Sequence, residues 1–98
     1  MTGTHMNRGR ILIAEDDDVS RENLVELLGA YDVHAVSDGL QALKTFHEDK
    51  FDLIITDLRM PNMDGMLLLK HIREDDPRAT VIIITGYGTV NTAVEAMK

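Results

Sequence analysis

Acidic residues follow two of the most apolar stretches of this sequence. Residues 10–16 read RILIAED and run into further aspartates, and residues 51–57 read FDLIITD and end in Asp57. A third apolar stretch, residues 80–86 (TVIIITG), carries Thr85 near its end. Carboxylates and a hydroxyl can hold a divalent cation, move protons or attack as nucleophiles, provided that the fold brings them together.

The elements that must position these residues alternate along the chain. The three apolar stretches are typical of strands buried on both faces, and residues 32–37 alternate in polarity and predict an edge strand. Apolar residues recur at three- or four-residue spacing over 18–28, 40–48, 64–75 and 89–98, which predicts four helices. Alternation of this kind predicts an α/β fold, a doubly wound parallel sheet joined by right-handed crossovers.

The first of these helices shows the expected packing and limits. We predict that Asp18 caps its amino end and that Gly29 stops it. One helical face is expected to be apolar and to contact the sheet; its members are Val19, Leu24, Leu27 and Leu28.

The carboxyl ends of parallel strands lie at one edge of a sheet, where open α/β folds bind their ligands. Glu15, Asp16, Asp57 and Thr85 are therefore expected to converge. An aspartate that merely caps a loop is the simpler interpretation at one strand end, but three convergent strand ends favour a site. Because like charges repel at short range, a bound cation is expected, and an all-oxygen ligand set suits Mg²⁺.

Three motifs carry a family resemblance over roughly residues 10–98. They are ILIAEDDD with Arg21 close behind, LIITDLRMPNMDG and VIIITG, in this order. The chain resembles a response regulator receiver domain of two-component signalling, which implies a flavodoxin-like receiver fold. Its ending, TGYGTVNTAVEAMK, resembles the receivers of enhancer-binding transcription activators.

The resemblance implies a role for each site residue. Asp57 is expected to be the phosphoacceptor, which takes a phosphoryl group from a sensor histidine kinase. Asp16, Asp57 and the backbone carbonyl of Arg59 are expected to hold Mg²⁺, with Glu15 acting through water. Thr85 is expected to sense the phosphoryl group, and the output is a conformational shift rather than enzymatic turnover.

The resemblance also implies a departure from the family pattern. Receiver domains continue to a fifth strand and a fifth helix, and this sequence is expected to stop before them. An exposed strand edge then invites self-association or exchange of elements between copies. We interpret residues 1–9 as an expression leader without order and residues 10–98 as a receiver domain truncated at its carboxyl end.

Composition limits the other classes of function. The formal net charge of −7 argues against direct binding of nucleic acid, and the apolar stretches are too short to cross a membrane. The absence of cysteine fits a cytoplasmic protein. Two alternatives stay open: an inert, self-assembling fragment with the receiver shape, and a phosphatase of the haloacid dehalogenase type with Asp16 as nucleophile and Asp18 as general acid.

Overall fold

The computed structural model describes residues 9–84. Its elements, in chain order, are β1 (Arg10–Ala14), α1 (Asp18–Leu27), β2 (Asp32–Val36), α2 (Gly39–Glu48), β3 (Leu53–Asp57), α3 (Gly65–Asp75) and β4 (Val81–Ile84). Three predictions lie outside the described residues: the leader apart from Gly9, the position of Thr85, and the fourth helix at residues 89–98.

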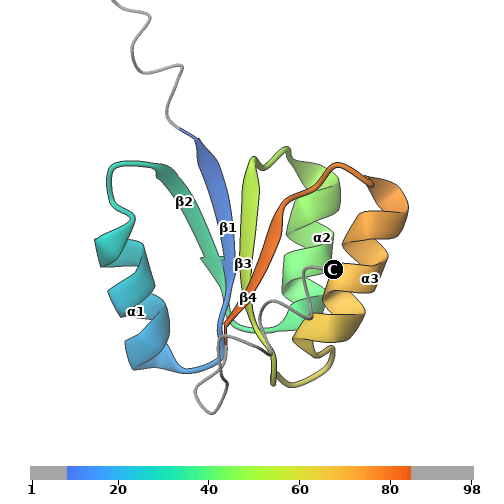
Figure 1. The fold of residues 1–98 in the computed structure, drawn as a ribbon. Helices are drawn as coiled ribbons and strands as arrows, with labels where there is room; N and C mark the ends of the chain where they lie inside the picture. The colour runs from blue at the N-terminus through green and yellow to red at the C-terminus, as the bar shows by residue number, and fades with distance from the viewer. Residues whose placement is uncertain (1–8, 85–98) are drawn as a thin grey trace, which may run out of the picture.

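The four described strands form one parallel sheet in the order β2-β1-β3-β4. Helix α1 lies on one face of this sheet, and α2 and α3 lie on the other (Figure 1). The predicted doubly wound α/β fold is confirmed. The alternating strand β2 lies at an edge, as its weaker apolar pattern predicted.

The sheet separates two apolar clusters of different size. The larger cluster fills the space between the sheet and the pair α2 and α3, and its fully buried side chains include Leu12, Ile54, Leu68, Ile72 and Ile83. The smaller cluster lies on the α1 side, and its buried members among residues 9–84 are Ile11, Ile13 and Ile55. Burial on both faces explains why the central strands β1 and β3 are apolar throughout.

Each described helix is preceded by an aspartate whose side chain accepts a hydrogen bond from a backbone N–H three residues later. Asp38 caps α2 and Asp64 caps α3 in this way. The prediction that Asp18 caps α1 was wrong by one residue. Asp17 is the cap and accepts from Ser20 N at 2.8 Å, because it keeps the extended backbone that an N-cap requires.

The predicted apolar face of α1 was half right. Leu24 and Leu28 pack on the strands, but Val19 is 65% exposed and Leu27 is 79% exposed. Val19 precedes Leu28 by nine residues, which places it about 180° away around a helix of about 3.6 residues per turn. Helix α1 ends at Leu27, and Gly29 follows the C-cap residue Leu28.

Candidate metal centre

The strand register brings the acidic residues together at the carboxyl edge of the sheet. Strands β1 and β3 pair in parallel with Ala14 beside Thr56, so the chain delivers Glu15 and Asp16 next to Asp57. One carboxylate oxygen from each of these acids lies within 4.8 Å of the other two. Of the four residues expected to converge, the structure groups these three, and Thr85 lies outside the described residues.

The three carboxylates differ in their surroundings. Glu15 is buried, Asp57 is half-buried and Asp16 is exposed. Backbone amides orient two of them: Asp17 N donates to Glu15 Oε2 at 3.1 Å, and Leu58 N donates to Asp57 Oδ1 at 2.8 Å. The site therefore combines the buried carboxylate of Glu15, the hydrogen-bonded strand-end carboxylate of Asp57 and the solvent-exposed carboxylate of Asp16.

The backbone under the site is fixed by side chains as well. Arg21 Nη1 donates to the carbonyl oxygen of Glu15 at 2.9 Å, so the basic residue close behind the acidic motif supports its main chain. Thr56, which is fully buried, donates through Oγ1 to the carbonyl oxygen of Asp57 at 2.9 Å. Neither role was predicted from the sequence; the available signal for Thr56 was a hydroxyl inside an otherwise apolar strand.

The pKa of Glu15 is raised to about 7. Burial is the main cause, and the nearby charges of Asp57 and Asp16 add to it, while the hydrogen bond from Asp17 N acts in the opposite direction. A cation among the three carboxylates would favour the ionised form of Glu15, because it would offset both the burial and the repulsion.

The donor set fits a small, hard divalent cation. All three donors are oxygens, and opposite ligands of an octahedral Mg²⁺ lie roughly 4.2 Å apart at about 2.1 Å from the metal. The 4.8 Å spread therefore needs little closure, or one carboxylate that acts through water. Arg59 lies two residues beyond Asp57, on the loop that leads to α3, and its side chain is exposed.

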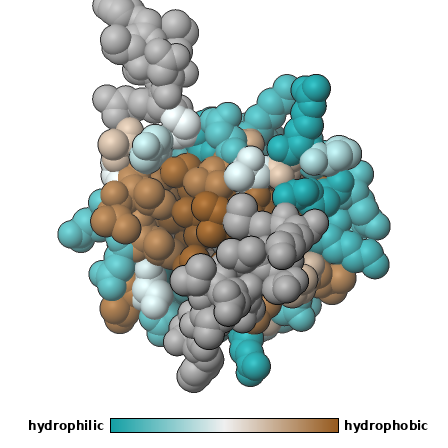
Figure 2. All heavy atoms as spheres, viewed as in Figure 1, coloured by the Kyte–Doolittle hydropathy of each residue, from teal (hydrophilic) through white to brown (hydrophobic). Residues whose placement is uncertain are grey.

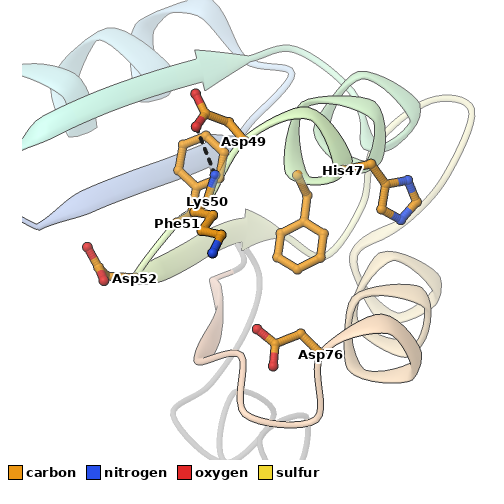
Figure 3. Close-up of a pocket in the computed structure, with 7 residues that line it drawn as sticks. His47, Asp49, Lys50, Phe51, Asp52 and Asp76 are labelled. Atoms are coloured by element: carbon orange, nitrogen blue, oxygen red, sulfur yellow. Dashed lines mark hydrogen bonds between the residues drawn. The ribbon is translucent and has the colours of Figure 1, made fainter.

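A cavity of about 490 Å³ lies at the opposite, amino edge of the sheet, and its wall includes the rings of Phe46 and Phe51 (Figure 3). Its acids already have partners. Asp49 forms an ion pair with Arg10, and Asp52 Oδ2 accepts from Arg10 N at 2.8 Å. This cavity is remote from the carboxylate cluster, so we place the functional site at the cluster.

Comparison with known families agrees with this geometry. A sequence model described as the response regulator receiver domain matches residues 11–98. The chain belongs to this family. A receiver domain is a signalling module and not a classical enzyme. The phosphatase alternative is therefore wrong, and the structure shows why: the Asp18 carboxylate points to Arg21 and is not part of the cluster.

Similar proteins extend the comparison. The receiver domain is 41% identical over 90 residues to the transcriptional regulatory protein ZraR of Klebsiella oxytoca. The aligned segment covers 89% of this chain and 20% of ZraR. It is 40% identical over 91 residues to the regulatory protein AtoC of Escherichia coli, with coverage of 91% and 20%. The receiver domain thus spans about a fifth of the length of these relatives.

Solved structures show the same fold. A response regulator receiver domain protein from Clostridium thermocellum matches with a TM-score of 0.81 and 33% identity, over 91% of this chain and 74% of that chain. The response regulator TrrA of Thermotoga maritima, in complex with Mg²⁺-BeF, matches with a TM-score of 0.81 and 31% identity. This match covers 92% of this chain and 82% of the TrrA chain. Within residues 9–84, no helix is long and apolar enough to span a membrane.

Proposed function

We propose that this receiver domain accepts a phosphoryl group on Asp57 from a phosphohistidine of a sensor histidine kinase. The observation that carries the proposal is the cluster of Glu15, Asp16 and Asp57, whose carboxylate oxygens approach within 4.8 Å at the carboxyl edge of the sheet. A strand-end carboxylate in such a cluster is both held in place and close to the ligands of a cation that can neutralise an incoming phosphoryl group.

The transfer follows from the position of Asp57. One oxygen of its carboxylate attacks the phosphorus, a P–O bond forms, and the P–N bond to the kinase imidazole breaks. The imidazole nitrogen leaves with the electron pair, and the product is an acyl phosphate on Asp57. Leu58 N, which donates to Asp57 Oδ1 at 2.8 Å, holds that oxygen and leaves Oδ2 for the attack.

We further propose Mg²⁺ as the cation. Asp16, Asp57 and the backbone carbonyl of Arg59 would bind it directly, and Glu15 would act through water. When bound, the metal supplies positive charge next to the phosphoryl oxygens that become more negative during transfer. The donor chemistry supports this choice, and the similar TrrA domain was solved with Mg²⁺-BeF.

Signalling beyond the site is part of the same proposal. Thr85 would bind the phosphoryl oxygen and convert phosphorylation into a population shift of the neighbouring segments. ZraR is named as a transcriptional regulatory protein, and we propose that this receiver domain likewise controls an output of that kind. We propose a cytoplasmic location, where a kinase can reach the site.

We also keep self-association as a proposal. In the described sheet, β4 pairs with β3 on one side only, so its other edge carries backbone groups that a second copy could pair with.

The proposed function is tested with Mg²⁺ and acetyl phosphate, a small phosphodonor that needs no cognate kinase. Intact masses are recorded for the wild type and for Asp57→Asn, each with Mg²⁺ and with EDTA. We expect one added phosphoryl group on the wild type in Mg²⁺ and none in the other three samples. A folded wild type that binds Mg²⁺ and gains no mass would support the inert fragment instead.

A further inference from the structure

The loop between β3 and α3, residues 58–64, would supply a metal ligand from its main chain and not from a side chain. The function proposed above assigns this role to the backbone carbonyl of Arg59. A carbonyl oxygen of the main chain is placed only by the contacts that hold its own segment. The supports of this loop therefore decide whether Arg59 meets the cation.

Backbone contacts fix both ends of the loop. Leu58 N donates to the carbonyl oxygen of Ile84 at 2.9 Å, and the carbonyl oxygen of Leu58 accepts from Gly65 N at 2.8 Å. The ends are so close that a Cβ at Gly65 would lie 2.3 Å from the carbonyl oxygen of Asp57. Arg59 directly follows Leu58, one of these paired ends, so the conformation of the rest of the loop sets the direction of its carbonyl.

Asn62 and Met63 hold the middle of the loop against α2. Asn62 has a φ of 70°, in the left-handed region, and Met63 N donates to the carbonyl oxygen of Pro61 at 2.7 Å. Asn62 Nδ2 donates to Asp38 Oδ2 at 3.1 Å. Met63 is buried, and a Cβ at Gly39 would lie 2.1 Å from its carbonyl oxygen, so the loop and the start of α2 touch through backbone.

Asp38 uses its two oxygens for two different tasks. Oδ1 accepts from Gln41 N at 2.8 Å and caps α2, and Oδ2 accepts from the loop residue Asn62. Asp38 as a whole residue is only 9% exposed, so water competes little for either bond. A helix cap is a rigid anchor, and the loop is attached to it across 24 positions of sequence.

We propose that Asp38 is a positioning residue for the metal site. Through Asn62 it holds the loop so that the Arg59 carbonyl faces the carboxylate cluster, and it thereby sets the affinity for Mg²⁺. This inference rests on the proposed function, because it assumes that the cluster binds Mg²⁺ with the help of Arg59. The simpler alternative is that Asp38 only caps α2 and that Asn62 only tolerates a positive φ.

Two charge-neutral variants separate these interpretations. Asn62→Gly keeps the left-handed backbone and the cap but removes the amide that binds Asp38. The double variant Asp38→Asn/Asn62→Asp exchanges donor and acceptor, so the amide at position 38 can still cap α2 with its oxygen and donate to the carboxylate at position 62. A merely structural role would show in stability and would leave the affinity for Mg²⁺ unchanged.

The experiment measures the Mg²⁺ dissociation constant by calorimetry for the wild type and both variants, with urea unfolding in EDTA as the check on folding. We expect Asn62→Gly to bind Mg²⁺ about tenfold more weakly, in line with the loss of a partner that orients a ligand. The reversed pair should bind within about threefold of the wild type, because its hydrogen bond is restored.

Two results would overturn the inference. One is an Asn62→Gly variant that binds Mg²⁺ as tightly as the wild type. The other is a folded reversed pair that binds Mg²⁺ about tenfold more weakly than the wild type, as Asn62→Gly is expected to do. If Asn62→Gly fails to fold, the comparison of the reversed pair with the wild type decides alone. A wild type that binds no Mg²⁺ would overturn the proposed metal site itself, and this failure is recognised before any variant is made.

Discussion

At the scale of single residues, the three carboxylates of the site lie close enough to repel one another when all are ionised. Glu15 is 6% exposed, and its carboxylate lies close to those of Asp16 and Asp57. Such a group is costly to ionise unless a cation is present, which is why its pKa is raised to about 7. The same arrangement that destabilises the metal-free domain prepares it to bind a cation.

We predict that Glu15→Gln stabilises the metal-free protein at high pH. Because the pKa of Glu15 is higher in the folded state than the ordinary 4.5, the protonated form favours folding; this contribution is complete below about pH 4.5 and is lost as the pH rises through 7. Gln mimics the protonated form at every pH. In EDTA at pH 8, the free energy of unfolding should rise by about 1 to 3 kcal/mol.

Urea unfolding of the two proteins at pH 5 and pH 8 checks this prediction. The stabilisation should largely disappear at pH 5, where Glu15 of the folded wild type is itself protonated. Saturating Mg²⁺ should reduce the advantage of Glu15→Gln at pH 8, since the cation stabilises the ionised wild type. A variant that is less stable than the wild type at pH 8 in EDTA would contradict the account.

At the scale of elements, the site depends on how strands and helix starts meet at one edge of the sheet. Parallel register places the acids of β1 beside Asp57 of β3, and the capped start of α2 supports the loop that follows. This second support is a close backbone contact. Gly39 lies against Met63 so tightly that any side chain there would meet main-chain atoms.

We predict that Gly39→Ala destabilises the fold by about 2 to 4 kcal/mol, because the new Cβ would lie 2.1 Å from the carbonyl oxygen of Met63 and backbone cannot yield cheaply. Gly29→Ala is the matched control, since its Cβ would lie 3.3 Å from the nearest atom, and we expect a change below about 1 kcal/mol. Urea unfolding measures both, and equal effects of the two substitutions would contradict the tight contact.

The elements also show what the sequence could and could not predict. Apolar strands that end in acids were recognisable because strand burial and strand direction are encoded locally, and this placed Glu15, Asp16 and Asp57 correctly. The Asp38–Gly39 pair indicates by sequence no more than a turn. The bond from Asn62 to Asp38 joins residues 24 positions apart, so no local pattern could reveal it. The exposed face of α1 was misjudged because periodicity cannot tell which of two apolar sides meets the sheet.

At the scale of the whole molecule, the two sides of the sheet are unequally covered. Two helices pack on one face, and among the described elements α1 alone lies on the other (Figure 1). Apolar side chains gather on the molecular surface beside α1 (Figure 2). The partly buried apolar residues of this side are Leu24, Leu28, Val33, Leu53, Ile82 and Ile84.

We predict that the protein dimerises in a concentration-dependent way through β4 and this apolar side. Ile82 lies on β4, which is an outer strand of the sheet within residues 9–84, and it is only partly buried, so a lysine there should disfavour pairing. Sedimentation velocity over a range of concentrations compares the wild type with Ile82→Lys. We expect the wild type alone to shift toward a dimer, and a wild type that stays monomeric throughout would contradict this prediction.

The central claim is that Asp57 is the residue that takes the phosphoryl group. Borohydride reduces an aspartyl phosphate to homoserine, so the acceptor can be marked permanently and located by peptide mass spectrometry. After incubation of the wild type with Mg²⁺ and acetyl phosphate, we expect homoserine at position 57 and aspartate at positions 16 and 17. Homoserine at either of those positions instead, with Asp57 unchanged, would contradict the account.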